Sequence, residues 1–186
     1  MGRSKQTSAP AATAERLAFR EPAATDGVRV HALVAACPPL DPNSLYCNLL
    51  QCTHFAGTSV LAERDGELLG WISGYRPPRE PHTLFVWQVA VHERARGLGL
   101  ARRMIFSLLE RPALRGIAYI KTTVTPGNDA SRALFRSIAE RAGTGIRESE
   151  GFDEARHFRG RHDSEKLLTI GPFRGAGARD GTRSAA

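Results

Sequence analysis

The sequence predicts a fold of the α/β class, with a mixed, twisted sheet of about six to seven strands flanked by about four helices. Strand and helix patterns alternate through the second half of the chain, which indicates parallel strands joined by helical crossovers. In the first half, an Asp-Gly turn signal between two apolar runs indicates an antiparallel hairpin. With 186 residues, of which 41% are hydrophobic and 24% charged, the chain can form one domain with a full core.

The first half is expected to form one strand, two helices and the hairpin. Asp26 and Asp41 are candidate N-caps, and Pro42 suits the first position of the helix that Asp41 would cap. Pro38 and Pro39 end the preceding helix, because proline has no backbone N–H to donate. The expected elements are a strand at 17–20, helices at 28–36 and from 42 to about 54, and strands at 58–63 and 67–75.

The second half is expected to contain two strand–helix pairs and a closing strand. A proline-rich loop at 76–81 precedes them, and Asn128 or Asp129 caps the later helix. Residues 146–163 show no clear pattern apart from one strand near Arg147. The expected elements are strands at 83–91, 117–124 and 165–170, and helices at 97–110 and from 128 to about 141.

Composition excludes several classes of protein. No apolar run approaches the ~20 residues of a membrane span, and the N-terminus lacks the apolar centre of a secretory signal. The three cysteines show no CxxC spacing, which favours a reducing cytoplasm over a disulfide framework. Much of the net charge of +7 lies in residues 1–17 and 174–186, which lack periodicity and are predicted to be disordered tails around a domain at 18–173. We therefore expect neither a membrane nor a nucleic-acid partner.

The segment from Arg94 to Ala101 is a basic, glycine-containing turn between an apolar strand and an amphipathic helix. The first N–H groups of such a helix have no internal partner and attract anions. No P-loop motif is present, and the dinucleotide motif GxGxxG/A fails at Arg102. The spacing R/Q-x-x-G-x-G/A fits Arg94 to Gly99 and predicts a pyrophosphate site. A glycine-capped helix with solvated arginines is the alternative interpretation.

That motif, in a strand–turn–helix setting, resembles the GNAT acetyltransferase superfamily. The resemblance implies a GNAT fold in which the turn binds the pyrophosphate of acetyl-CoA and the end of the strand pairs with the pantetheine arm. Strand N–H groups could also polarise the thioester carbonyl. In the family, the helix that follows Asn128 commonly contains Leu-Tyr, and the tyrosine protonates the leaving CoA thiolate. This chain has Leu134-Phe135 instead. The implied cofactor-binding residues are Val89, Ala90, Val91, Arg94, Arg96, Gly97, Leu98, Gly99, Leu100, Ala101, Asn128 and Phe135.

Further blocks at 38–55, 84–91, 121–128, 157–165 and 170–173 are similar to the diaminobutyrate acetyltransferase family of ectoine synthesis. The resemblance covers most of the chain. It implies transfer of acetyl from acetyl-CoA to the 4-amino group of L-2,4-diaminobutyrate by direct attack in a ternary complex, in an osmoprotective pathway. It also implies a cytoplasmic homodimer. The alternative is a GNAT enzyme that acetylates another small amine or a protein or peptide amine.

The resemblance assigns five residues to the acceptor. Asp41, Tyr46, Trp87, His162 and Glu165 are implied to bind the substrate, and Tyr46, His162 and Glu165 to be catalytic. Glu165 would bind an ammonium group, His162 could accept its proton, and the face of Trp87 could hold a cation. From the residues alone, a helix cap explains Asp41 better than a ligand does, and packing explains Tyr46. The groups that accept the amine proton and protonate the thiolate stay open.

Two further interpretations concern the same residues. Strand alternation places Trp87, Val89 and Val91 on one face and Val86, Gln88 and Ala90 on the other. His157, His162 and Glu165 could form a metal site, but their spacing matches no standard zinc pattern, and Arg159 and Arg161 oppose a cation. No metal is therefore expected.

Overall fold

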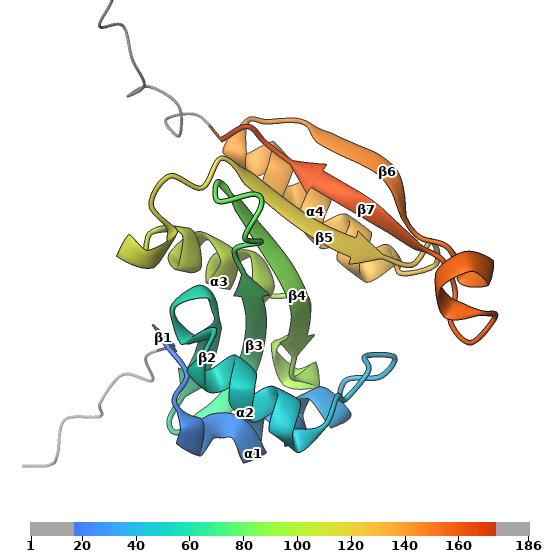
Figure 1. Ribbon diagram of the computed structural model, residues 1–186. Helices are drawn as coiled ribbons and strands as arrows, with labels where there is room; N and C mark the ends of the chain where they lie inside the picture. The colour runs from blue at the N-terminus through green and yellow to red at the C-terminus, as the bar shows by residue number, and fades with distance from the viewer. Residues whose placement is uncertain (1–16, 174–186) are drawn as a thin grey trace, which may run out of the picture.

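The computed structural model describes residues 17–173, so nearly all of both predicted tails lies outside the described residues. The described part forms one seven-stranded sheet with the strand order β1-β2-β3-β4-β5-β7-β6 (Figure 1). Its strands are β1 (Ala18–Arg20), β2 (Val60–Arg64), β3 (Glu67–Tyr75), β4 (Thr83–Val91), β5 (Tyr119–Val124), β6 (Ile146–Phe152) and β7 (Glu165–Ile170). Its longer helices are α1 (Gly27–Ala35), α2 (Leu45–Thr53), α3 (Leu100–Leu109) and α4 (Asp129–Ala142).

The sheet is mixed, as the sequence predicts. Strands β1 to β4 pair antiparallel, β4 pairs parallel with β5, and β5, β7 and β6 pair antiparallel again. The single parallel pair follows from α3, which carries the chain from the end of β4 back to the start of β5. Every predicted strand is present, including β6 at the position expected near Arg147.

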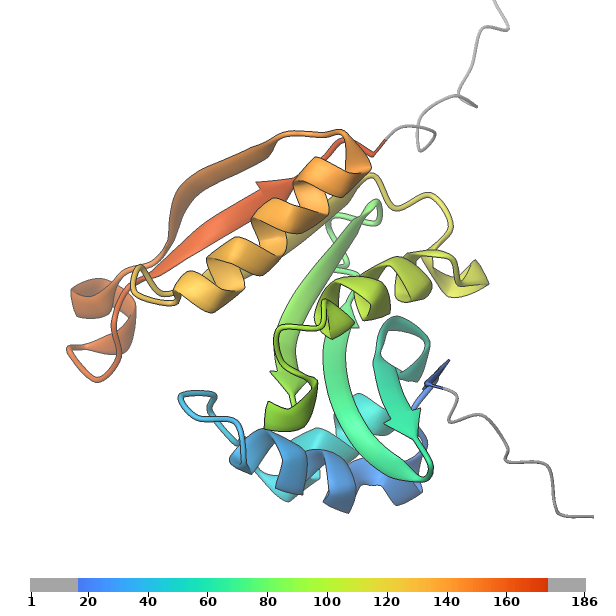
Figure 2. The same ribbon diagram turned by 180° about the vertical axis from the view of Figure 1, so that it is seen from behind.

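Helices cover both faces of the sheet. Figure 1 shows α1 and α2 across one face, over the half of the sheet that contains β1 to β4, and Figure 2 shows α3 and α4 on the opposite face. One core lies under α3 and α4 and includes Leu84, Met104 and Ile138. A second core lies under α1 and α2 and includes Val34 and Trp71. None of the helices in residues 17–173 is long and apolar enough to span a bilayer.

Two helix starts differ from the prediction. Helix α2 begins at Leu45, and its N-cap is Ser44, whose hydroxyl accepts from Cys47 N–H at 3.1 Å. The prediction of Asp41 as cap and Pro42 as first helical residue is wrong, because Asn43 has a left-handed backbone (φ +58°) that interrupts any helix there. Helix α3 begins at Leu100 rather than residue 97, since Gly97 and Gly99 also have positive φ.

Strand β4 contains a bulge that the sequence pattern conceals. Ser73 pairs with Gln88 and Gly74 with Val86, so Trp87 has no partner on β3. The extra residue reverses the alternation. Val86 and Val89 consequently contact the core under α3 and α4, whereas Ala90 belongs to the core under α1 and α2. The predicted assignment of Val86 and Ala90 to one face is therefore wrong.

Candidate active site

A cavity of about 840 Å³ lies where β4 separates from β5. The two strands pair only through Thr83–Phe85 and Tyr119–Lys121, and their remaining lengths diverge (Figure 1). Val89 and Val91 of β4 line one side of the cavity, and Ser131, Leu134 and other residues of α4 line the other. This volume lies within the range of sites for small molecules and cofactors.

The floor of the cavity is the turn that carries the phosphate motif. Gly97 and Gly99 have φ of +75° and +67°, which glycine adopts without strain. A Cβ on Gly97 would meet no protein atom within 4 Å, so packing does not require glycine there. Arg103 N–H makes the first helical bond, to Gly99 O at 3.1 Å. The N–H groups of the three residues before Arg103 thus have no helical partner and form an anion site.

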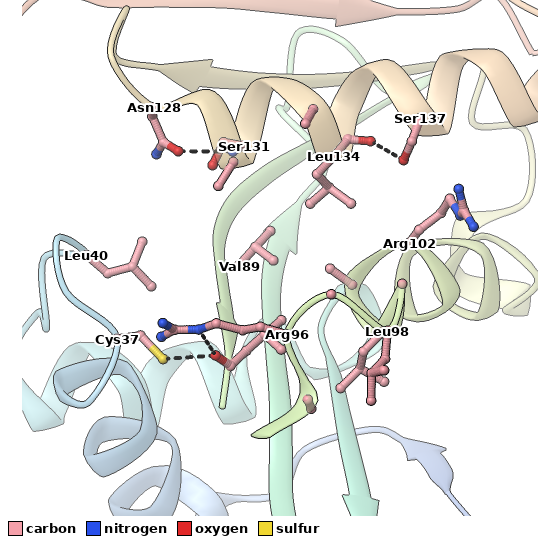
Figure 3. Close-up of a pocket in the computed structure, with 18 of the residues that line it drawn as sticks. Cys37, Leu40, Val89, Arg96, Leu98, Arg102, Asn128, Ser131, Leu134 and Ser137 are labelled. Atoms are coloured by element: carbon pink, nitrogen blue, oxygen red, sulfur yellow. Dashed lines mark hydrogen bonds between the residues drawn. The ribbon is translucent and has the colours of Figure 1, made fainter. Parts of the chain in front are cut away.

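Arg96 and Arg102 supply the positive charge that lines the cavity. Arg96 extends across the floor, and its Nε donates to Val91 O at 3.0 Å (Figure 3). Arg102, in the first turn of α3, has a buried Nε without a partner among the described residues. Arg94 forms an ion pair with Glu67 and does not line the cavity. Charge for a pyrophosphate is therefore concentrated at Arg96 and Arg102, of which the sequence analysis assigned only Arg96 to the cofactor.

The end of β4 directs backbone groups toward the cavity rather than toward β3. Val91 O accepts from Arg96 Nε and from Cys37 Sγ, at 3.0 and 3.4 Å, rather than from β3 (Figure 3). Alternate residues of a strand direct their N–H and C=O groups to the same edge, so those of Val89 also face the cavity. Those of Ala90 point toward β3, where Ala90 pairs with Trp71. Val89 and Val91 can thus bond to an extended ligand, whereas Ala90 serves the sheet and the core.

Helix α4 contributes its capped start and one face. Asn128 lines the cavity and caps the helix, accepting from Ser131 N–H at 3.0 Å as predicted. Phe135 is only 2% exposed and lies in the core, and the preceding Leu134 lines the cavity instead. The placement does not support the prediction of Phe135 as a cofactor-binding residue. Besides the two arginines, the proton-donating side chains in the lining include Cys37, Ser131 and Ser137.

Sequence reasoning missed one wall of the cavity. The α1–α2 loop, residues 36–44, contributes Cys37, Pro38, Pro39 and Leu40. Spacing could have identified the α4 wall, since Ala130, Ala133, Leu134 and Ser137 follow the three- and four-residue repeat of one helix face. The loop offers no such period, and only folding brings it against the turn.

Two of the five predicted acceptor residues lie on segments that also line this cavity: Asp41 directly follows Leu40, and Trp87 lies two residues before Val89. Gln88 Nε2 donates to Asp41 O at 2.7 Å, which holds Asp41 next to the strand position that follows Trp87. Trp87 is 44% exposed at the bulge, with its ring edge-on to Tyr75 at 6.4 Å between centroids. Tyr46, in the first turn of α2, is 69% exposed.

The remaining two of the five predicted acceptor residues lie on the β6–β7 hairpin. His162 and Glu165 lie at the end of the β6–β7 hairpin, which reaches out on the same side of the molecule as the α1–α2 loop in both views (Figures 1 and 2). His162 Nδ1 is 2.7 Å from Asp163 O, and its ring lies 4.7 Å from that of Phe158. Within residues 17–173, no hydrogen bond or ion pair joins this hairpin end to Asp41, Tyr46 or Trp87, and no cluster of His, Cys, Asp and Glu could hold a metal.

A glycine turn below the separation of two parallel strands, with a helix N-terminus facing the cavity, is the geometry that the GNAT motif implies. Residues 29–139 match the Acetyltransferase (GNAT) family. The chain therefore belongs to the GNAT acetyltransferases. A solved ribosomal-protein-S18-alanine N-acetyltransferase from Escherichia coli shares this fold, with a TM-score of 0.62 at 13% identity over 89% of this chain and 100% of that one.

Within this family, the chain belongs with the L-2,4-diaminobutyric acid acetyltransferases. The relative so named from Methylotuvimicrobium alcaliphilum is 51% identical over 158 residues, which cover 85% of this chain and 92% of the relative. That from Halomonas elongata is 43% identical over 86% of this chain and 83% of the relative. Diaminobutyrate acetyltransferase EctA from Paenibacillus lautus, solved with L-2,4-diaminobutyric acid and coenzyme A, matches with a TM-score of 0.82 at 41% identity, covering 86% of this chain and 96% of that one.

Proposed function

We propose that this enzyme transfers acetyl from acetyl-CoA to the 4-amino group of L-2,4-diaminobutyrate. The observation that supports acetyl-CoA as the donor is the turn at Gly97 and Gly99. There, backbone N–H groups and the start of α3 face a cavity of about 840 Å³. The acceptor follows from membership of a family whose solved member binds diaminobutyric acid. The product is N4-acetyl-L-2,4-diaminobutyrate, and the pathway is the ectoine synthesis that the sequence resemblance implies.

Each wall of the cavity has a task in this reaction. The α3 N-terminus, Arg96 and Arg102 neutralise the pyrophosphate. The backbone of Val89 and Val91 bonds to the pantetheine arm, and an N–H at this edge polarises the thioester carbonyl. The amine, with an ordinary pKa near ~10.4, must lose a proton before it attacks. We assign ammonium binding to Asp41, Glu165 and the face of Trp87, a catalytic role to Tyr46, and proton acceptance to His162.

A panel of amines tests this proposal. Release of CoA is measured with diaminobutyrate, lysine, ornithine and a peptide amine, and the acetylated product is identified by NMR. We expect diaminobutyrate to have the highest kcat/KM and the acetyl group to be on its 4-nitrogen. Equal rates with all four amines would contradict the substrate but not the GNAT chemistry.

We further propose that the enzyme acts as a cytoplasmic homodimer. The sheet face opposite α3 and α4 has no helix over β5 and β7 in Figure 1. Trp87 and Tyr119 are exposed there, and Tyr75 and Phe85 lie between them with their rings 5.2 Å apart. Exposed aromatic side chains are typical of protein interfaces. A second copy on this face would cover them and could bring its β6–β7 hairpin to the first copy's cavity, which sedimentation of the pure enzyme tests.

A further inference from the structure

The α1–α2 loop forms part of the donor site and part of the proposed acceptor site. Its first half, residues 37–40, lines the cofactor cavity. Cys37 anchors that half, donating from Sγ to Val91 O at 3.4 Å, and Leu40 N–H bonds to Cys37 O at 3.0 Å. Its second half carries Asp41, which lies exposed beyond the cavity. The two halves therefore need separate attachments to β4.

Gln88 provides the attachment of the second half. Its side chain is 6% exposed, and its Nε2 donates to Asp41 O at 2.7 Å. Asn43 Nδ2 lies 3.5 Å from Gln88 Oε1 and 3.3 Å from Asp41 O, which closes a ring of three polar groups. A buried amide with both ends engaged is costly to remove, because its partners lose bonds that solvent cannot fully replace.

The same ring orients the Asp41 carboxylate. Asn43 N–H donates to Asp41 Oδ1 at 2.9 Å, and this bond depends on the left-handed backbone of Asn43. Asn43 is in turn held through its amide by Gln88. One carboxylate oxygen of Asp41 is thus fixed, and the other is available to a cation in solvent.

We propose that Gln88 is a positioning residue, which presents the Asp41 carboxylate to the amine substrate through the α1–α2 loop. It lies between Trp87, at the bulge, and Val89, at the cavity, so one strand sets the distance between acceptor and donor. This inference rests on the proposed function, since it takes Asp41 as a substrate-binding residue. It adds that the position of Asp41 is determined by a buried amide on β4.

A double-mutant cycle tests the proposal with Gln88→Leu, Asp41→Ala and the pair together. Gln88→Leu is expected to raise KM for diaminobutyrate roughly tenfold or more, as loss of a buried hydrogen bond implies. The dissociation constant of acetyl-CoA should change less than about threefold, since Cys37 holds the other half of the loop. Because Gln88 acts through Asp41, the double variant should have the KM of Asp41→Ala alone.

Gln51→Leu is the matched control. Gln51 is fully buried in α2 and accepts from Asn48 Nδ2 at 3.1 Å, without a bond to the loop. Gln51→Leu should lower stability. It should leave KM at the wild-type value when alone and at the Asp41→Ala value when combined with that substitution. An unchanged KM in Gln88→Leu, multiplicative effects in the double variant, or the same KM pattern in Gln51→Leu would each overturn the proposal. Absence of wild-type activity on diaminobutyrate would instead contradict the proposed function.

Discussion

Two glycines in the turn after β4 let the main chain come close to a phosphate. Gly97 and Gly99 both have positive φ, but their surroundings differ. A Cβ on Gly97 would meet no protein atom within 4 Å, whereas one on Gly99 would lie 3.7 Å from an Arg102 guanidinium nitrogen. At Gly97 a side chain would therefore meet ligand rather than protein.

Gly97→Ala should weaken acetyl-CoA binding, because the added methyl group enters the space that the pyrophosphate needs. We expect a roughly tenfold or greater rise in the dissociation constant, measured by isothermal titration calorimetry. The left-handed backbone adds a stability cost of about 1–2 kcal/mol.

Gly143→Ala controls for that cost. Gly143 ends α4 with φ of +61°, and a Cβ there would also meet nothing within 4 Å. It does not line the cavity. The control should lose similar thermal stability and keep normal acetyl-CoA affinity. Equal weakening of binding in both variants would assign the effect to strain alone.

At the scale of elements, an ion-pair cluster fastens β1 to β2 and to the start of α1. Arg20 bonds to Asp26 at 2.7 Å and to Glu63 at 2.6 Å, and Arg29 bonds to Glu63 at 2.8 Å. Asp26 also accepts from Ala23 N–H at 2.8 Å. It occupies the predicted N-cap position of α1, but its carboxylate bonds to Arg20 and Ala23 instead of the backbone N–H groups at the helix start. Hydrogen bonds from Arg20 lower the pKa of Asp26.

The lowered pKa of Asp26 gives stability a pH dependence with a definite sign. The folded state binds the Asp26 proton less tightly than the unfolded chain does, where the pKa is about 3.9. The contribution is thus fully present above that value and is lost as pH falls through the folded pKa. Asp26→Asn should lower the free energy of unfolding by about 2 kcal/mol at neutral pH, and the difference from wild type should shrink on acidification.

Urea unfolding across the acid range measures that difference, with Glu148→Gln as control. Glu148 also has a lowered pKa, because Arg132 donates a hydrogen bond to it. This ion pair, 2.7 Å long, joins α4 to β6 on the protein surface. Exposed pairs contribute little to stability, so this variant should unfold like wild type. A constant difference between Asp26→Asn and wild type at every pH would contradict the electrostatic explanation.

Sequence patterns predicted the elements better than their junctions. Strand β3 and strand β4 lie where periodicity places them, and the glycine turn was identifiable because its chemistry is local. The bulge at Trp87 was not, since one extra residue in a strand of apolar residues leaves the alternation looking regular. The start of α2 was mistaken because Asp41 and Ser44 can both cap, and the left-handed Asn43 decided between them.

The site was predictable to the extent that its parts are contiguous in sequence. Asn128 and the turn residues from Arg96 to Ala101 line the cavity, whereas Arg94 of the same motif does not. Phe135 was predicted to bind the cofactor, but it lies in the core and Leu134 lines the cavity. The sequence does not decide between these neighbours, because the rotation of α4 about its axis depends on its packing against the sheet. The contact between Gln88 and Asp41 joins residues far apart in sequence, and no local pattern encodes it.

At the scale of the whole molecule, the donor site is one formed cavity, whereas the predicted acceptor residues lie on separate segments of the chain. The cavity has its floor, both walls and its positive charge. Asp41 and Trp87 lie on segments that line it through Leu40 and Val89, and His162 and Glu165 lie at the end of the β6–β7 hairpin (Figure 1). If all four serve one substrate, the site is formed in one of two ways. A single chain would use its own α1–α2 loop and hairpin end, which lie on the same side in Figure 1, whereas a symmetric dimer would combine Asp41 of one chain with Glu165 of the other.

Complementation between two weakly active variants distinguishes the two arrangements. Asp41→Ala and Glu165→Ala should each lower kcat/KM for diaminobutyrate about a hundredfold or more and leave turnover measurable. Acetyl-CoA binding should be retained, since neither residue lines the cavity. The two variants are co-expressed with different tags, and the mixed dimer is purified. If each site uses residues of both chains, the mixed dimer contains one site with both substitutions and one intact site. The mixed dimer should then recover about half of wild-type activity by two-fold symmetry. A mixed dimer as inactive as its parents would place both residues in a site formed by a single chain.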